Sequence, residues 1–110
     1  MKINLTQPII GRNNEPMRDA AQTPVGEEKV FPILTLREVC IYSLLGMDPK
    51  ETLTSRERYD RGKLIDTLDL HDEVDLSAEQ ITMLKELVGK YMSGNLVITR
   101  TWDLLDPPAD

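Results

Sequence analysis

Apolar residues recur at helical spacing in three stretches of the chain, and each stretch follows a helix-start pattern. The starts are Thr35–Glu38, Thr54–Glu57 and Ser77–Gln80, where a hydroxyl stands three residues before a Glu or a Gln. In such a capping box, the two side chains bond the free backbone N–H groups of the first helical turn. The pattern predicts helices at about 36–45, 55–68 and 78–92.

Each predicted helix has a distinct pattern. The first, 36–45, is apolar on nearly all sides, which indicates a central buried helix, and Gly46 suits the left-handed residue that ends many helices. The second carries Gly62 in its interior, where glycine costs about 1 kcal/mol relative to alanine, so we expect another element to approach it closely. The third has an apolar stripe formed by Ile81, Leu84, Leu87, Val88 and Tyr91.

The segment 96–105 has two readings. Ile98, Trp102 and Leu105 have helical spacing, and Asn95 could cap such a helix. The β-branched residues at 97–99 favour a strand instead. We favour the helix, and we expect Trp102 to lie in the core rather than to anchor an interface.

The N-terminal third of the chain predicts extended structure. Residues 2–6 alternate polar and apolar side chains, and Asn13 and Asn14 tolerate the left-handed conformation of a tight hairpin turn. A polar loop should follow at 18–28. Residues 29–34 could then add a short third strand.

Length and composition fit one globular domain. The chain has 110 residues, of which 40% are hydrophobic and 29% charged. We expect a single α+β domain, mostly α, over residues 1–110, with a β-hairpin or small sheet and a loop at 1–34 packed on three to four helices at 35–106. No stretch approaches the roughly 18 apolar residues of a membrane span, so we expect no membrane contact.

Signatures of catalysis or metal binding are weak. Cys40, the single cysteine, lies in an apolar run and excludes an internal disulfide. His71, the single histidine, stands in the acidic segment 66–79, whose spacing matches no calcium or zinc pattern. We predict no catalytic residue, no metal and no cofactor. Segment 66–79 is interpreted as a solvated turn, or as an acidic surface used by a partner.

The net charge of −6 disfavours direct binding to nucleic acid, which depends on a basic surface. Four basic residues nevertheless stand in the first half of the predicted helix 55–68, where they oppose the helix dipole. They are Arg56, Arg58, Arg61 and Lys63. We predict that they bind a protein partner, with a solvated helix face as the alternative. Reversing Arg58 and Arg61 to Glu should then weaken partner capture with little change in thermal stability.

Several local patterns occur together in one order along the chain. Lys2–Pro8 opens a turn-rich hairpin, Leu34–Glu38 starts a helix, and Glu73–Glu79 and Trp102–Leu105 follow. In this plan the chain resembles short phage-encoded proteins of uncharacterised function. The resemblance implies a noncatalytic accessory factor in the host cytoplasm that binds and modulates a host or phage protein. The alternative is a small structural or assembly component of the virion, and self-association is compatible with both.

Overall fold

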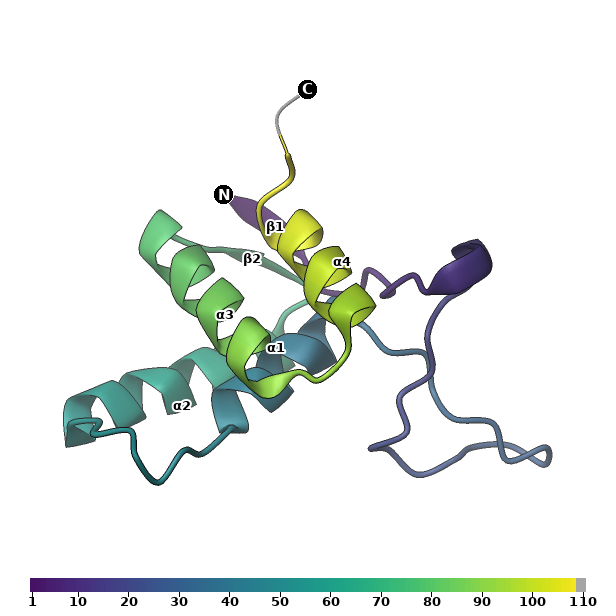
Figure 1. Cartoon of the computed structure of the whole chain (residues 1–110), viewed down its shortest axis with the longest axis horizontal. Helices are drawn as coiled ribbons and strands as arrows, with labels where there is room; N and C mark the ends of the chain where they lie inside the picture. The colour runs from purple at the N-terminus through teal and green to yellow at the C-terminus, as the bar shows by residue number, and fades with distance from the viewer. Residues whose placement is uncertain (109–110) are drawn as a thin grey trace.

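Four helices form the body of the protein, and an irregular arm made of residues 6–34 extends from it (Figure 1). The structure, a computed structural model, describes residues 1–108, so the last two residues of the predicted domain lie outside the described part. The elements are β1 (Lys2–Asn4), a short 3-10 helix η1 (Arg12–Asn14), α1 (Leu36–Leu45), α2 (Ser55–Leu70), β2 (Glu73–Asp75), α3 (Ala78–Tyr91) and α4 (Asn95–Leu105). The predicted α+β class, mostly α, is confirmed.

Helix α1 is the centre of the body, because α2, α3 and α4 all pack against it. It has the predicted bounds, but the capping box expected at Thr35 is wrong, since this residue makes no side-chain cap hydrogen bond. The N-terminal segment does the capping instead. The N–H of Leu36 donates to the carbonyl of Gln7 at 2.9 Å, and the N–H of Arg37 donates to that of Leu5 at 3.1 Å. Backbone carbonyls therefore satisfy the first turn.

The other helices follow the sequence patterns more closely. The capping boxes at Thr54 and Ser77 are both present, and α2 runs two residues beyond the predicted end. Segment 95–105 is a helix, as preferred, although Gly94 rather than Asn95 is its N-cap residue. None of the helices within residues 1–108 combines the length and the apolar character that crossing a lipid bilayer requires.

The placement of Trp102 in the core is wrong, because 39% of the residue is exposed. Its indole N–H donates to the backbone carbonyl of Lys85 at 3.0 Å, and the ammonium of the same lysine lies 4.9 Å from the ring centroid. Both contacts are made at the surface of α3: the hydrogen bond satisfies the polar edge of the indole, and the ammonium lies over its face.

The N-terminal strand pairs with a distant segment rather than with a hairpin neighbour. β1 and β2 form a two-stranded antiparallel sheet in which Ile3 lies opposite Val74. Both of these residues are buried, whereas their strand neighbours are exposed. The predicted alternation in β1 is therefore present, and burying its apolar face selects β2 as the partner.

The expected hairpin turn exists inside the arm. Asn13 and Asn14 both have positive φ, 61° and 59°, and the turn is closed by an isolated bridge between Ile10 and Pro16. The third strand expected at 29–34 is wrong. Only isolated bridges form there, and Pro32 lacks the N–H that a continuous ladder would need.

Candidate functional site

The structure divides the four predicted basic residues between two sides of α2. Arg56 and Lys63 flank the exposed ring of Tyr59, each with its charged group 5.5 Å from the ring centroid. Arg56 also pairs with Asp60 one turn along the helix, at 3.2 Å. Such exposed contacts contribute little stability. Arg56 and Lys63 therefore lie on a solvated face of α2.

Arg58 and Arg61 belong to the other side of α2. The guanidinium of Arg61 donates to Oε1 of Glu51 at 2.9 Å, and both side chains are largely buried, with 16% and 20% exposed. Arg58 is exposed and makes no ion pair within the described residues 1–108. The four predicted residues therefore do not form one patch. Arg61 bonds Glu51 within the fold, whereas Arg58 is exposed and can contact a partner.

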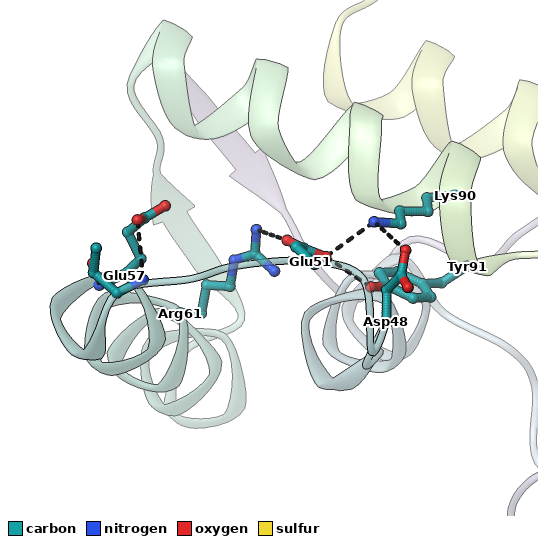
Figure 2. A network of polar contacts seen from close by, with 7 residues as sticks. Asp48, Glu51, Glu57, Arg61, Lys90 and Tyr91 are labelled. Atoms are coloured by element: carbon teal, nitrogen blue, oxygen red, sulfur yellow. Dashed lines mark hydrogen bonds and ion pairs between the residues drawn. The ribbon is translucent and has the colours of Figure 1, made fainter.

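Glu51 is the centre of a polar network that ties the loop after α1 to α2 and α3. Figure 2 shows its carboxylate between the Arg61 guanidinium and the Lys90 ammonium. Its Oε2 accepts from Lys90 at 3.0 Å and from the Tyr91 hydroxyl at 3.1 Å. Lys90 also pairs with Asp48 at 3.2 Å. The loop at residues 46–54 is thus fixed at two points by α3 and at one by α2.

The network lowers the pKa values of its two carboxyl groups. The hydrogen bond from Lys90 holds the pKa of Glu51 below its usual value. The backbone N–H of Lys50 does the same for the pKa of Asp48, and Lys90 adds to the effect. These acids favour the charged form when folded, because their donors stabilise the carboxylate.

We expect the network to stabilise the fold near neutral pH and to lose this contribution in acid. A carboxyl group with a lowered folded-state pKa contributes stability above its unfolded pKa, and this is lost as the pH falls through the folded value. Glu51 should therefore lose its contribution below about pH 4.5 and Asp48 below about pH 3.8, the ordinary pKa values of Glu and Asp. Lys90→Gln removes the main donor to Glu51. The free energy of unfolding of this variant should therefore fall less steeply with decreasing pH than that of the wild type. Urea unfolding of both proteins between about pH 3 and about pH 7 measures the difference; equal slopes would contradict the prediction.

Beside the network, a groove of about 240 Å³ opens between the end of α1, the following loop and α2, and we call it the α1–α2 groove. Its lining residues are Leu44, Leu45, Gly46, Met47, Asp48, Glu51, Leu53, Arg58, Arg61, Gly62 and Ile65. Five of these have large apolar side chains, two are glycines and four are charged. Two of the large apolar residues at its edge are strongly exposed, Leu45 at 60% and Met47 at 85%. Their exposure has no local sequence signal, because Leu45 ends an apolar run that is otherwise mostly buried and Met47 follows it after Gly46.

Two glycines of the groove differ from expectation. Gly46 is not left-handed, since its φ is −58° and its ψ is 141°. It is required for a different reason: a Cβ there would lie 2.5 Å from the ring of Tyr91. Conversely, no element within residues 1–108 approaches Gly62, whose Cβ would have no atom of this part of the chain within 4 Å. The prediction of close packing at Gly62 is wrong, and the space there belongs to the groove.

The two arginines of the groove should respond differently to charge reversal. Arg61→Glu would place a second carboxylate against Glu51 in a largely buried position, so we expect a clear loss of thermal stability. Arg58→Glu should change the free energy of unfolding by no more than about 0.5 kcal/mol, as at other exposed sites. Thermal melts of the two variants test this contrast. Equal melting temperatures would show that Arg61 contributes no more than Arg58 to folding.

A second polar cluster anchors the arm. Asp19 is 3% exposed, and its carboxylate accepts from the Tyr42 hydroxyl at 2.5 Å, from Gln22 at 2.7 Å and from the N–H of Ala21 at 3.0 Å. Burial, together with the charge of Asp19, raises the pKa of the nearby Glu38. Because protein donors already occupy both oxygens of Asp19, the cluster is suited to fixing the arm on α1.

Some acids of segment 66–79 pair with cations supplied by α1 and by the N-terminus. Arg37 pairs with Asp72 at 2.6 Å, and the Met1 ammonium with Asp75 at 2.8 Å. Within residues 1–108, no group of three or more His, Cys, Asp or Glu side chains is arranged to hold a metal ion. Part of the acidic surface therefore has an internal role in holding β1.

Cys40 is fully buried in α1, and this burial raises the pKa of its thiol to about 12. A thiol with so high a pKa is not a nucleophile near neutral pH. The side chain packs in the core as a small apolar residue.

Comparison of the chain with models of protein families, with curated proteins and with solved structures finds no match. The resemblance to phage-encoded proteins therefore stays a prediction. The function has to be argued from the geometry of the α1–α2 groove.

Proposed function

We propose that the protein is a noncatalytic protein-binding factor and that the α1–α2 groove is its docking surface. The observation that carries the proposal is the exposure of Leu45 and Met47 at the edge of a groove with an apolar lining. Large apolar side chains gathered around a concavity are typical of interaction sites, because association removes them from water.

The polar network supports the same conclusion. Glu51 fixes the loop that carries Met47, through Arg61 of α2 and Lys90 of α3. A loop held in one conformation before association loses little entropy when a partner binds. The network thus gives the groove a defined shape without covering it.

We place the partner among host or phage proteins and the site of action in the host cytoplasm. This part of the proposal rests on the resemblance in the N-terminal, central and C-terminal motifs. A structural or assembly role in the virion is the alternative. Mass spectrometry of purified particles separates the two, since a stoichiometric amount of the chain in particles would contradict an accessory role.

Photocrosslinking tests the docking surface directly. A photoreactive amino acid at Met47 should yield a discrete adduct with another protein in cells that produce the chain. The matched control carries the same group at Thr99, an exposed position on α4. Equal adducts from both positions, or none from position 47, would contradict the proposal.

A further inference from the structure

The charges around the α1–α2 groove are not balanced. Its two acids are already bonded, Glu51 to Arg61 and Lys90, and Asp48 to Lys90. Arg58 lines the same groove and has no acidic partner in the described part of the chain, residues 1–108. The groove therefore presents an unpaired positive charge, although the protein as a whole has a net charge of −6.

Gly62 adds a second, independent observation. Glycine inside a helix is unfavourable relative to alanine, and at this position no neighbouring atom requires its small size. Gly89, in the interior of α3, also has room for a Cβ, which would lie at an ordinary van der Waals distance of 3.5 Å from Trp102. The folded monomer thus gives no packing reason for Gly62. Its missing side chain does leave the wall of the groove open beside Arg58, one turn away on α2.

The size of the groove limits what can occupy it. About 240 Å³ is less than the roughly 300–1,000 Å³ typical of sites for drug-sized molecules. It is better suited to an anchor side chain from a protein segment.

We propose that the groove receives a segment of a partner protein that places an apolar side chain over Gly62 and a carboxylate against Arg58. This inference rests on the proposed function and names the chemistry of the partner. A guanidinium binds a carboxylate through paired, charge-assisted hydrogen bonds. A basic segment would meet Arg58 with the same charge and would find both acids of the groove already bonded.

Matched peptides test the charge preference. The probes are two 12-residue peptides of leucine with alternating charged residues, one containing glutamate and the other lysine. We expect the glutamate peptide to bind at least tenfold more tightly, with NMR shift changes at residues 44–47 and 58–65. Arg58→Gln should weaken its binding about tenfold. Equal affinity for both peptides, or shift changes elsewhere, would overturn the inference.

Two glycine variants provide the matched control. Gly62→Ala and Gly89→Ala should each raise the melting temperature by roughly 3 to 6 °C, because alanine favours the helix. Only Gly62→Ala should weaken binding of the glutamate peptide, by about tenfold, since its methyl group enters the groove. Equal affinity of the two variants would remove the assigned role of Gly62.

The outcomes also separate this inference from the proposed function. Crosslinked adducts at Met47 without a preference for the glutamate peptide would leave the docking surface standing and reject the acidic partner. Absence of both adducts and peptide binding would reject both. Sedimentation of the free protein decides whether a second copy is the occupant, because self-association that is lost in Met47→Glu would overturn the proposal of a partner protein.

Discussion

Gly46→Ala is expected to lower the free energy of unfolding by about 2–3 kcal/mol, the cost typical of forcing an extra group into a packed site. The added Cβ would lie 2.5 to 2.6 Å from three ring atoms of Tyr91, so either the ring or the loop has to move. The ring cannot move freely, because its hydroxyl donates to Glu51. The backbone of Gly46 is extended, so conformational strain does not contribute.

A double-mutant cycle isolates this clash. In a Tyr91→Ala background the ring is absent, and Gly46→Ala should then have little effect on stability. Urea unfolding of the four proteins at neutral pH provides the free energies. An equal cost of Gly46→Ala in both backgrounds would show that its origin is not the Tyr91 ring.

Arg37→Met is expected to lower the free energy of unfolding by about 2 kcal/mol, because the substitution leaves the C-terminal end of α2 without its cation. The guanidinium donates to the carbonyl of Leu68 at 2.8 Å and to that of His71 at 2.9 Å. It also pairs with Asp72 at 2.6 Å. Helix α2 has no basic residue in its own last turn, so α1 supplies the charge that its sequence lacks.

Arg37→Lys separates charge from geometry. Lysine keeps the positive charge near the helix end but lacks the planar fork that reaches two carbonyls and a carboxylate together. We expect its stability to fall between those of the wild type and Arg37→Met. Hydrogen exchange should show the loss of protection concentrated at residues 66–72, where the helix end opens. Full stability of Arg37→Met would mean that solvent satisfies these carbonyls equally well.

The two substitutions affect the groove differently. Gly46 and the network around Glu51 shape one wall of it, so Gly46→Ala should also reduce binding of the glutamate peptide. The Arg37 side chain, from the start of α1, contacts the far end of α2, and its loss should leave binding by the folded fraction unchanged. Arg37→Met therefore tests stability without an effect on docking, whereas Gly46→Ala is expected to affect both.

Local sequence patterns determined the helices. Two capping boxes, the apolar stripe of α3 and the apolar run of α1 act between residues no more than a few turns apart. These signals can be recognised within each segment, so the helix bounds could be predicted to within about two residues. The left-handed asparagines of the arm belong to the same class, because a tight turn is also local.

Only the tertiary structure decided how these elements are used. The alternation in β1 predicted a strand but could not select β2 over the arm, because strand pairing joins residues some 70 positions apart. The sequence predicted one basic patch on α2, but Arg61 is paired with Glu51 in the folded protein, whereas Arg58 is exposed. Gly46, rather than Gly62, is the glycine that a distant side chain approaches closely, because the space around a glycine depends on tertiary packing. Close packing and charge pairing between distant segments, which no local pattern encodes, therefore shaped the candidate docking groove.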